Sequence, residues 1–180
     1  QIRAATVQAK RMNMSTIGYD FFVVAAHPDD AEVQMGGTIA KLTRAGQRAL
    51  IIDLCDGEPA DYAPAGVRRQ QAMRAAQILG ADRLLLDQQD RFITDNISTR
   101  LTVARLIRQH RPRMIFATTE ACIHPDHAAV KSLIAAAVFY ARLKILDPHR
   151  AVGLGAEAVD RVVGGIEADL AHEPVQIGRA

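Results

Sequence analysis

Two clusters of polar residues, far apart along the chain, hold the side chains that could bind a metal ion or transfer protons. The first is His-Pro-Asp-Asp at residues 27–30, directly after the apolar run 23–26. The second is His-Pro-Asp-His at residues 124–127, which follows the apolar run 114–117. Imidazole and carboxylate groups are common zinc ligands, and a catalytic zinc site uses three protein ligands plus water. Read together, the two clusters predict a mononuclear metal site.

The spacing within each cluster suits a shared site. His27 and Asp30 are three residues apart, and so are His124 and His127. If each cluster leads into a helix, residues at this spacing point to one side of that helix. The set is larger than zinc requires, so two assignments stay open: every histidine binds the ion, or one histidine per cluster stays free as an acid.

Both assignments lead to the same kind of reaction. Bound zinc lowers the pKa of its water to about 7, and a neighbouring carboxylate can take the proton as that water attacks a carbonyl. A free imidazolium could then stabilise the oxyanion or protonate a leaving amine. The residue types therefore predict metal-assisted amide hydrolysis.

The segments around the clusters alternate between apolar runs and amphipathic helical patterns. The predicted strands cover residues 19–26, 49–54, 83–86 and 114–118, and the predicted helices cover residues 33–45, 67–79, 97–110, 128–143 and 156–170. This alternation predicts an α/β fold, a Rossmann-like three-layer sandwich with a mostly parallel sheet. In such sheets the binding site lies beyond the carboxyl ends of the strands, where both clusters fall. A G-x-G-x-x-G fingerprint is absent, so the sequence gives no support for a dinucleotide site.

Composition narrows the class of protein. The 180 residues fit one domain, residues 1–180, with an extension at 1–16 and an atypical or truncated C-terminal part at 144–180. A formal charge of +2 argues against nucleic acid or an anionic membrane as an obligatory partner. Apolar runs fall short of the roughly 20 residues that a membrane span needs. Two cysteines and no recognisable signal peptide predict a cytoplasmic protein, and a homo-oligomer stays open.

The two clusters, taken with their neighbours, closely resemble a known family. Ala26–Glu32 (AHPDDAE), then Met35–Thr38 (MGGT), and the His-Pro-Asp-His cluster resemble the PIG-L/LmbE-like zinc-dependent de-N-acetylases. The resemblance covers about residues 19–143. It is nearest to the bacterial branch that removes acetyl from N-acetylglucosaminyl conjugates, as in bacillithiol and mycothiol biosynthesis. It implies a zinc-dependent hydrolase with a small amino-sugar substrate, and iron(II) fits the same ligands.

The resemblance also implies a role for each residue of the clusters. By motif position, His27, Asp30 and His127 would bind zinc, and Asp29 would be the general base for the water. These four roles resolve the assignment left open above, with His124 free of the metal.

The remaining roles implied by the family concern the acid and the substrate. His124 would be the general acid or the electrostatic partner of the oxyanion, and Asp126 would orient and tune it. Arg68 and Asp90 fall where the family binds the sugar. Some relatives carry a tyrosine where this chain has Cys122, which affects the expected rate and leaves the expected chemistry unchanged.

Two other functions are compatible with the same residues. The site could cleave another amide, such as an acyl chain on an antibiotic sugar. Alternatively, the chain could be a non-catalytic metal-binding module with an incomplete substrate lid, because the part after Leu143 is short and aromatic-free. The presence of Asp29, His124 and Asp126 argues against a module, which has no chemical need for a base and an acid.

Overall fold

The computed structural model describes residues 18–60, 63–118 and 123–143, together with the backbone of residues 161–163. In chain order the elements are β1 (Phe21–Ala25), α1 (Asp30–Arg44), β2 (Ala49–Cys55), α2 (Val67–Leu79), β3 (Asp82–Gln88), α3 (Ile97–His110), β4 (Met114–Ala117), α4 (Pro125–Arg142) and β5 (Arg161–Val163). The strands form one sheet in the order β3-β2-β1-β4-β5, and every neighbouring pair is parallel. The predicted α/β fold is confirmed.

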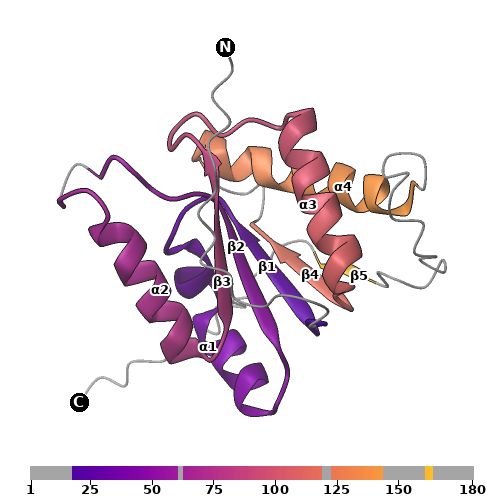
Figure 1. Ribbon diagram of the computed structural model, residues 1–180, viewed down its shortest axis with the longest axis horizontal. Coiled ribbons are helices and arrows are strands. Elements are labelled where there is room, and N and C mark those ends of the chain that lie inside the picture. Colours follow the sequence, from indigo (N-terminus) through magenta and orange to yellow (C-terminus); the bar gives the residue numbers. More distant parts are fainter. Residues whose placement is uncertain (1–17, 61–62, 119–122, 144–160, 164–180) are drawn as a thin grey trace, which may run out of the picture.

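Helices cover both faces of the sheet. On β1, Phe22 and Val24 belong to a core that includes side chains of α3 and α4. The alternate residues Phe21 and Val23 belong to a second core with side chains of α1 and α2. Figure 1 shows the same arrangement, with α1 and α2 on one side of the sheet and α3 and α4 on the other. Since successive side chains of a strand point to opposite faces, an unbroken apolar run suits a strand covered twice.

The two helices that follow the clusters begin earlier than the sequence predicts. We expected starts at residues 33 and 128, whereas α1 begins at Asp30 and α4 at Pro125. Proline suits the first helical position, because its missing N–H has no helical partner there, and the His124 side chain accepts from the Asp126 N–H as the cap. Asp30 and His127 therefore lie in the first turns of their helices. By contrast, α2 and α3 have the predicted bounds.

A buried ion-pair group ties the start of α1 to the sheet. The Arg83 side chain of β3 is fully buried and donates to both carboxylate oxygens of Asp53, at 2.5 and 2.9 Å, and to the Glu32 carboxylate of α1. Burial alone would lower the pKa of Arg83, but the bonds to Asp53 and Glu32 outweigh it and raise that pKa. Because Glu32 lies two residues after Asp30, this contact fixes the turn that carries Asp30.

The predicted helix 156–170 is wrong where the structure describes it. Residues 161–163 form β5, which pairs with β4 in the register Ile115↔Val162. Two of the three residues of β5 are valines, and β-branched residues are enriched in strands. The helical spacing of the apolar residues around them led to the wrong prediction. The rest of that predicted helix, the extension at 1–16 and Cys122 lie outside the described residues. Within the described part of the chain, helices are too short or too polar to cross a membrane.

Candidate active site

The sheet order brings the two clusters together. β1 and β4 are neighbours, with Val24 paired to Ala117, although β2 and β3 lie between them in sequence. The strand order therefore runs from β1 to β2 and β3 on one side, and from β1 to β4 and β5 on the other. Such a reversal of strand order leaves a crevice beyond the carboxyl ends of the two central strands, β1 and β4. His27 follows β1 and His127 lies in the first turn of α4, so both reach this edge.

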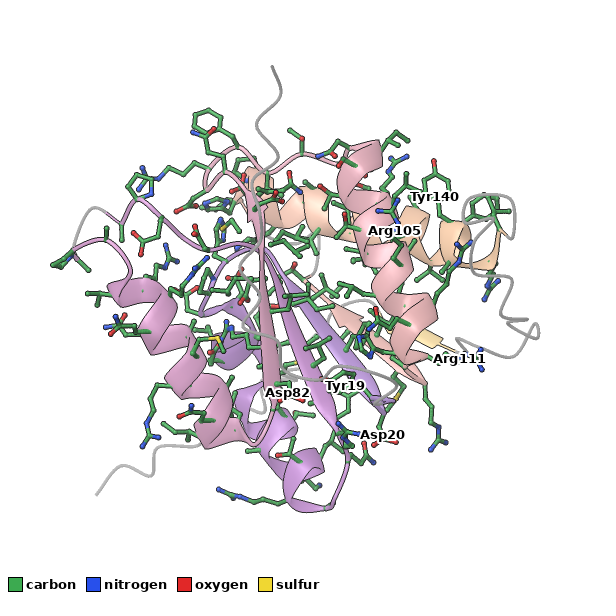
Figure 2. All side chains as sticks on the ribbon, viewed as in Figure 1. Tyr19, Asp20, Asp82, Arg105, Arg111 and Tyr140 are labelled. Atoms are coloured by element: carbon green, nitrogen blue, oxygen red, sulfur yellow. The ribbon has the colours of Figure 1, made fainter. Side chains whose placement is uncertain are left out.

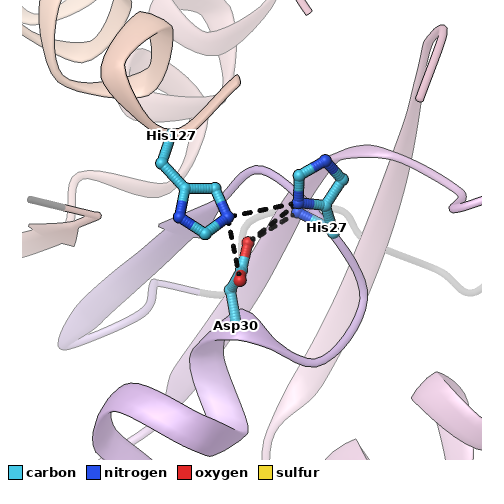
Figure 3. A group of neighbouring side chains, drawn as sticks. All are labelled: His27, Asp30 and His127. Atoms are coloured by element: carbon cyan, nitrogen blue, oxygen red, sulfur yellow. Dashed lines mark hydrogen bonds and ion pairs between the residues drawn. The ribbon is translucent and has the colours of Figure 1, made fainter. Parts of the chain in front are cut away.

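Three predicted metal ligands form a compact triangle, which Figure 3 shows between α1 and α4. The His27 Nδ1 and His127 Nε2 atoms lie 3.3 Å apart. Asp30 completes the triangle, with Oδ2 at 3.4 Å from His27 Nδ1 and Oδ1 at 3.1 Å from His127 Nε2. Bonds of about 2.0–2.1 Å at a tetrahedral angle place neighbouring ligand atoms about 3.3 Å apart. With one Asp30 oxygen toward each histidine, the three side chains have the spacing of one face of a tetrahedral zinc site.

The protonation of these groups follows from their surroundings. Burial raises the pKa of Asp30, but hydrogen bonds from His27 outweigh it and the net pKa is lowered. Burial lowers the pKa of His127, which favours the neutral imidazole that a metal requires. Burial also lowers the pKa of His27, but the neighbouring carboxylates of Asp30, Asp126 and Asp90 outweigh it and raise that pKa.

The second ring nitrogen of His27 faces carboxylates on its other side. His27 Nε2 lies 2.9 Å from Asp126 Oδ2 and 3.2 Å from Asp90 Oδ1. Asp126 is almost fully buried, and its Oδ1 accepts from the backbone N–H of Ile93 at 3.3 Å. We expected Asp126 to orient His124, yet its carboxylate bonds to His27.

His124 caps α4 and stacks beside His127. Its Nδ1 accepts from the Asp126 backbone N–H at 3.3 Å, so a neutral His124 carries its hydrogen on Nε2. The ring centroids of His124 and His127 are 5.0 Å apart, and those of His124 and His27 are 4.8 Å apart. His124 therefore presents a hydrogen-bond donor next to the triangle.

Asp29 has an unusual backbone conformation and an open side chain. It is the N-cap of α1 with φ of 154°, a region that non-glycine residues rarely adopt. Its side chain is 60% exposed and lies 3.5 Å from Arg68 Nη2. Burial raises the pKa of Asp29, and Arg68 offsets part of that rise. Strained residues of this kind gather at functional sites.

Arg68 and Asp90 are in contact with each other next to the site. Arg68 Nη1 lies 3.5 Å from Asp90 Oδ2 and donates to Gly57 O at 3.4 Å. The Asp90 side chain is only 9% exposed. Gly57, which sequence reasoning did not place in the site, has φ of +72°, and a Cβ there would lie 2.7 Å from the Arg68 side chain. A glycine just after a predicted strand was the available signal for this close approach.

Cys55 lies beneath these residues at the end of β2. It is fully buried, and its Sγ donates to Ala26 O at 3.4 Å. Burial raises the pKa of the Cys55 thiol to about 12, so the thiol is neutral. A ligand atom of Cys55 lies within 4.8 Å of ligand atoms of both His27 and Asp90. Sequence reasoning did not place Cys55 this close to the site.

Comparison with known families identifies the class of this site. The model of the GlcNAc-PI de-N-acetylase family, PIG-L, matches residues 22–138. That match spans more than half of the chain and includes both clusters. The chain therefore belongs to the PIG-L family, as its motifs indicated.

Individual relatives extend this comparison. A diacetylchitobiose deacetylase from Thermococcus kodakarensis is 30% identical over 152 residues, which cover 73% of this chain and 57% of the relative. The chain thus spans little more than half the length of that enzyme. A conserved protein of Thermus thermophilus superposes with a TM-score of 0.70 at 36% identity, over 82% of this chain and 66% of that chain.

A third relative has a different reaction. A 4-carboxy-2-hydroxymuconate hydratase from Pseudomonas putida superposes with a TM-score of 0.63 at 25% identity, over 71% of this chain and 59% of that chain. Relatives that share this fold are thus named for two different reactions. The reaction of this chain has to be argued from its site.

Proposed function

We propose that the protein is a zinc-dependent hydrolase that removes the acetyl group from an N-acetylated amino sugar, such as an N-acetylglucosaminyl conjugate. One observation carries this proposal: donor atoms of His27, Asp30 and His127 lie 3.1–3.4 Å apart, the spacing of a zinc ligand set. Iron(II) is a second metal for the same ligands. We further propose a cytoplasmic location, on the grounds of cysteine usage alone.

The charge of the site supports a bound cation. Three buried carboxylates, those of Asp30, Asp90 and Asp126, face the histidines, and Arg68 pairs with one of them, Asp90, and with the exposed Asp29. Buried like charges are costly unless a cation or a proton compensates them. A divalent ion held by His27, Asp30 and His127 would supply that compensation. When bound, it would also polarise the amide carbonyl and lower the pKa of a water molecule.

Asp29 is the proposed general base. Its side chain is open to solvent while the neighbouring Asp30 is buried, so the two carboxylates are suited to different tasks. Asp29 would accept a proton from the attacking water as that water bonds to the acetyl carbon. The Arg68 guanidinium, at 3.5 Å, would hold the carboxylate in place.

His124 is the proposed acid. With Nδ1 occupied by the Asp126 backbone N–H, its Nε2–H is the donor available to a substrate. In this neutral form it would stabilise the oxyanion with the Nε2 hydrogen. To give a proton to the leaving nitrogen as the C–N bond breaks, it would act from the imidazolium, in which an Nδ1 hydrogen replaces the bond from the Asp126 N–H. The products are acetate and a free amine, which balances the addition of one water.

Arg68 and Asp90 are the proposed substrate contacts. Arg68 reaches Asp29 with one nitrogen and Asp90 with another, so it links the proposed base to Asp90. Asp90 already faces His27 and Arg68, and a sugar hydroxyl would compete with those partners. The amino-sugar class is supported by the diacetylchitobiose deacetylase named among the relatives.

Acetate release tests the proposed function. Zinc-loaded protein is incubated with N-acetylglucosamine-type substrates and, in parallel, with a panel of other acylated amines. We expect acetate from the N-acetyl sugars and its loss in Asp29→Ala. Activity that survives Asp29→Ala would contradict the assigned base, and cleavage of other amides alone would assign another substrate. Stoichiometric zinc without any hydrolysis would favour a non-catalytic module.

A further inference from the structure

The environment of His27 differs between its two ring nitrogens. Nδ1 faces the proposed metal ligands, with Asp30 Oδ2 at 3.4 Å and His127 Nε2 at 3.3 Å. Nε2 faces the opposite way, toward Asp126 Oδ2 at 2.9 Å and Asp90 Oδ1 at 3.2 Å. A neutral imidazole carries one hydrogen, so one side of this ring must donate and the other must accept.

The distances decide which side donates. The 2.9 Å separation between Nε2 and Asp126 is the usual length of an N–H···O hydrogen bond. The separations around Nδ1 are longer and match the spacing of about 3.3 Å between two ligands of one zinc ion. Two further groups of ligand atoms, one with His124 and Asp126 and one with Cys55 and Asp90, also include His27. The hydrogen-bond length at Nε2 argues against a metal on that side.

Asp126 is itself held in place by its other oxygen. Its Oδ1 accepts from the Ile93 backbone N–H at 3.3 Å, and the side chain is nearly fully buried. An ionised carboxylate can only accept hydrogen bonds, so the hydrogen between His27 Nε2 and Asp126 Oδ2 is carried by His27. Asp90 supplies a second acceptor at the same nitrogen, and Arg68 offsets its charge.

Building on the metal site of the proposed function, we propose that Asp126 is a positioning residue that acts through the metal ligand His27 and not through His124. Its carboxylate accepts the Nε2 hydrogen, which fixes the His27 tautomer and directs the Nδ1 lone pair toward Asp30 and His127. Carboxylates that hold the second nitrogen of a metal-bound histidine typically contribute about 10–100-fold to metal affinity. This is a different role from the tuning of His124 that the motif implies.

Asp126→Asn is the sharpest variant, because it keeps the size of the side chain. The amide oxygen of asparagine can accept from Ile93 N–H only if its NH₂ group faces His27 Nε2. A donor at that position favours the tautomer with hydrogen on Nδ1, and that hydrogen blocks the metal. Asp126→Asn should therefore weaken zinc binding about 10–100-fold, at least as much as Asp126→Ala.

Metal affinity is measured without substrate, by zinc competition with a chromophoric chelator, for wild type, Asp126→Asn, Asp126→Ala and His124→Ala. We expect both Asp126 variants to lose affinity and His124→Ala to stay within about threefold of wild type, since His124 is not in the proposed ligand set. If Asp126→Asn instead keeps the wild-type zinc affinity, as His124→Ala should, the role through His27 is wrong.

The wild-type protein provides a second readout that does not depend on any variant. ¹⁵N–¹H correlation spectra of the metal-free protein, recorded at a pH above the raised pKa of His27 so that the ring is neutral, report the His27 tautomer. Hydrogen on Nε2 is the expected result, and hydrogen on Nδ1 would overturn the proposal. Failure of the deacetylase function would appear in acetate release alone, whereas both readouts here are taken without substrate.

Discussion

The two edges of the sheet use similar side chains in opposite ways. At the amino ends of the strands, which we term the amino edge, Tyr19 OH donates to Asp82 Oδ2 at 2.8 Å, and the Arg48 guanidinium lies 5.3 Å from the centroid of the Tyr19 ring. Figure 2 shows Tyr19, Asp20 and Asp82 grouped near this end of the sheet. Asp20 accepts from the Arg48 backbone N–H at 2.8 Å. At the amino edge these hydrogen-bond donors therefore face acceptors.

At the carboxyl ends of the strands, the carboxyl edge, like groups face each other. Rings of His27, His124 and His127 lie with centroids 4.8–5.3 Å apart. Carboxylates of Asp90 and Asp126 both approach one nitrogen of His27. Such an arrangement is unfavourable for a protein alone and becomes favourable with a cation. We therefore propose that the polar groups of the amino edge contribute to stability and those of the carboxyl edge to ligand binding.

The largest expected effect comes from removing a ligand at the carboxyl edge. His127→Ala deletes one of three proposed donors, so zinc affinity should fall by more than the roughly 100-fold that an outer partner can cost, and acetate release should be lost. Equilibrium dialysis against zinc measures the first effect. Tyr19→Phe, at the amino edge, is the control and should bind zinc like wild type. Equal zinc affinity in His127→Ala and wild type would contradict the assignment of metal binding to the carboxyl edge.

The next effect concerns the proposed base. Asp29→Asn keeps the size of the side chain but cannot accept a proton, so the turnover number should fall about 10²–10⁴-fold. Zinc affinity should not change, because Asp29 lies outside the ligand triangle. Steady-state acetate release and chelator competition on the same sample separate these outcomes. A variant that loses its metal would place Asp29 among the ligands and contradict the assigned role.

A smaller effect is expected at the amino edge. Tyr19→Phe removes the hydrogen bond to Asp82 but keeps the ring that packs against His110. The free energy of unfolding should fall by about 1–2 kcal/mol, with turnover unchanged, as denaturant titration and the acetate assay can measure. Tyr140→Phe is a matched control, because Tyr140 OH accepts at 3.4 Å from Arg100 and its loss should cost less. Loss of turnover in Tyr19→Phe would contradict a purely stabilising role.

The smallest effect is a pH dependence of that same bond. Burial and the bond to Asp82 raise the pKa of Tyr19. Its stabilising contribution is therefore complete below the unfolded pKa of about 10 and is lost as pH rises from there toward the folded pKa. The stability difference between wild type and Tyr19→Phe should shrink above that pH in urea titrations. A constant difference from neutral to strongly alkaline pH would contradict the observed hydrogen bond.

The sequence predicted this fold well because its signals are local. Unbroken apolar runs predicted β1 and β2, and the amphipathic pattern of residues 67–79 predicted the bounds of α2. β5 was not predicted, because a three-residue edge strand depends on its pairing with β4. The buried Arg83 group was missed for a similar reason. A charged residue in a short predicted strand gives no sign that Asp53 and Glu32 lie opposite it.

The candidate site was predicted in part. The spacing of the two clusters left the ligand set open, and the family resemblance named His27, Asp30 and His127. Donor atoms of these three side chains lie 3.1–3.4 Å apart in the structure. The contact of Asp126 with His27 joins side chains 99 residues apart and depends on how α4 packs against β1. Periodicity cannot give the direction of one carboxylate across such a distance, so the partner of Asp126 required the structure.

The most direct test of the account is anomalous diffraction at the zinc edge from crystals soaked in zinc. We predict one strong peak within about 2.0–2.2 Å of His27 Nδ1, His127 Nε2 and a carboxylate oxygen of Asp30. A peak on the Nε2 side of His27, between Cys55 and Asp90, or no peak near His27 at all, would contradict the central claim that these three side chains form the metal site.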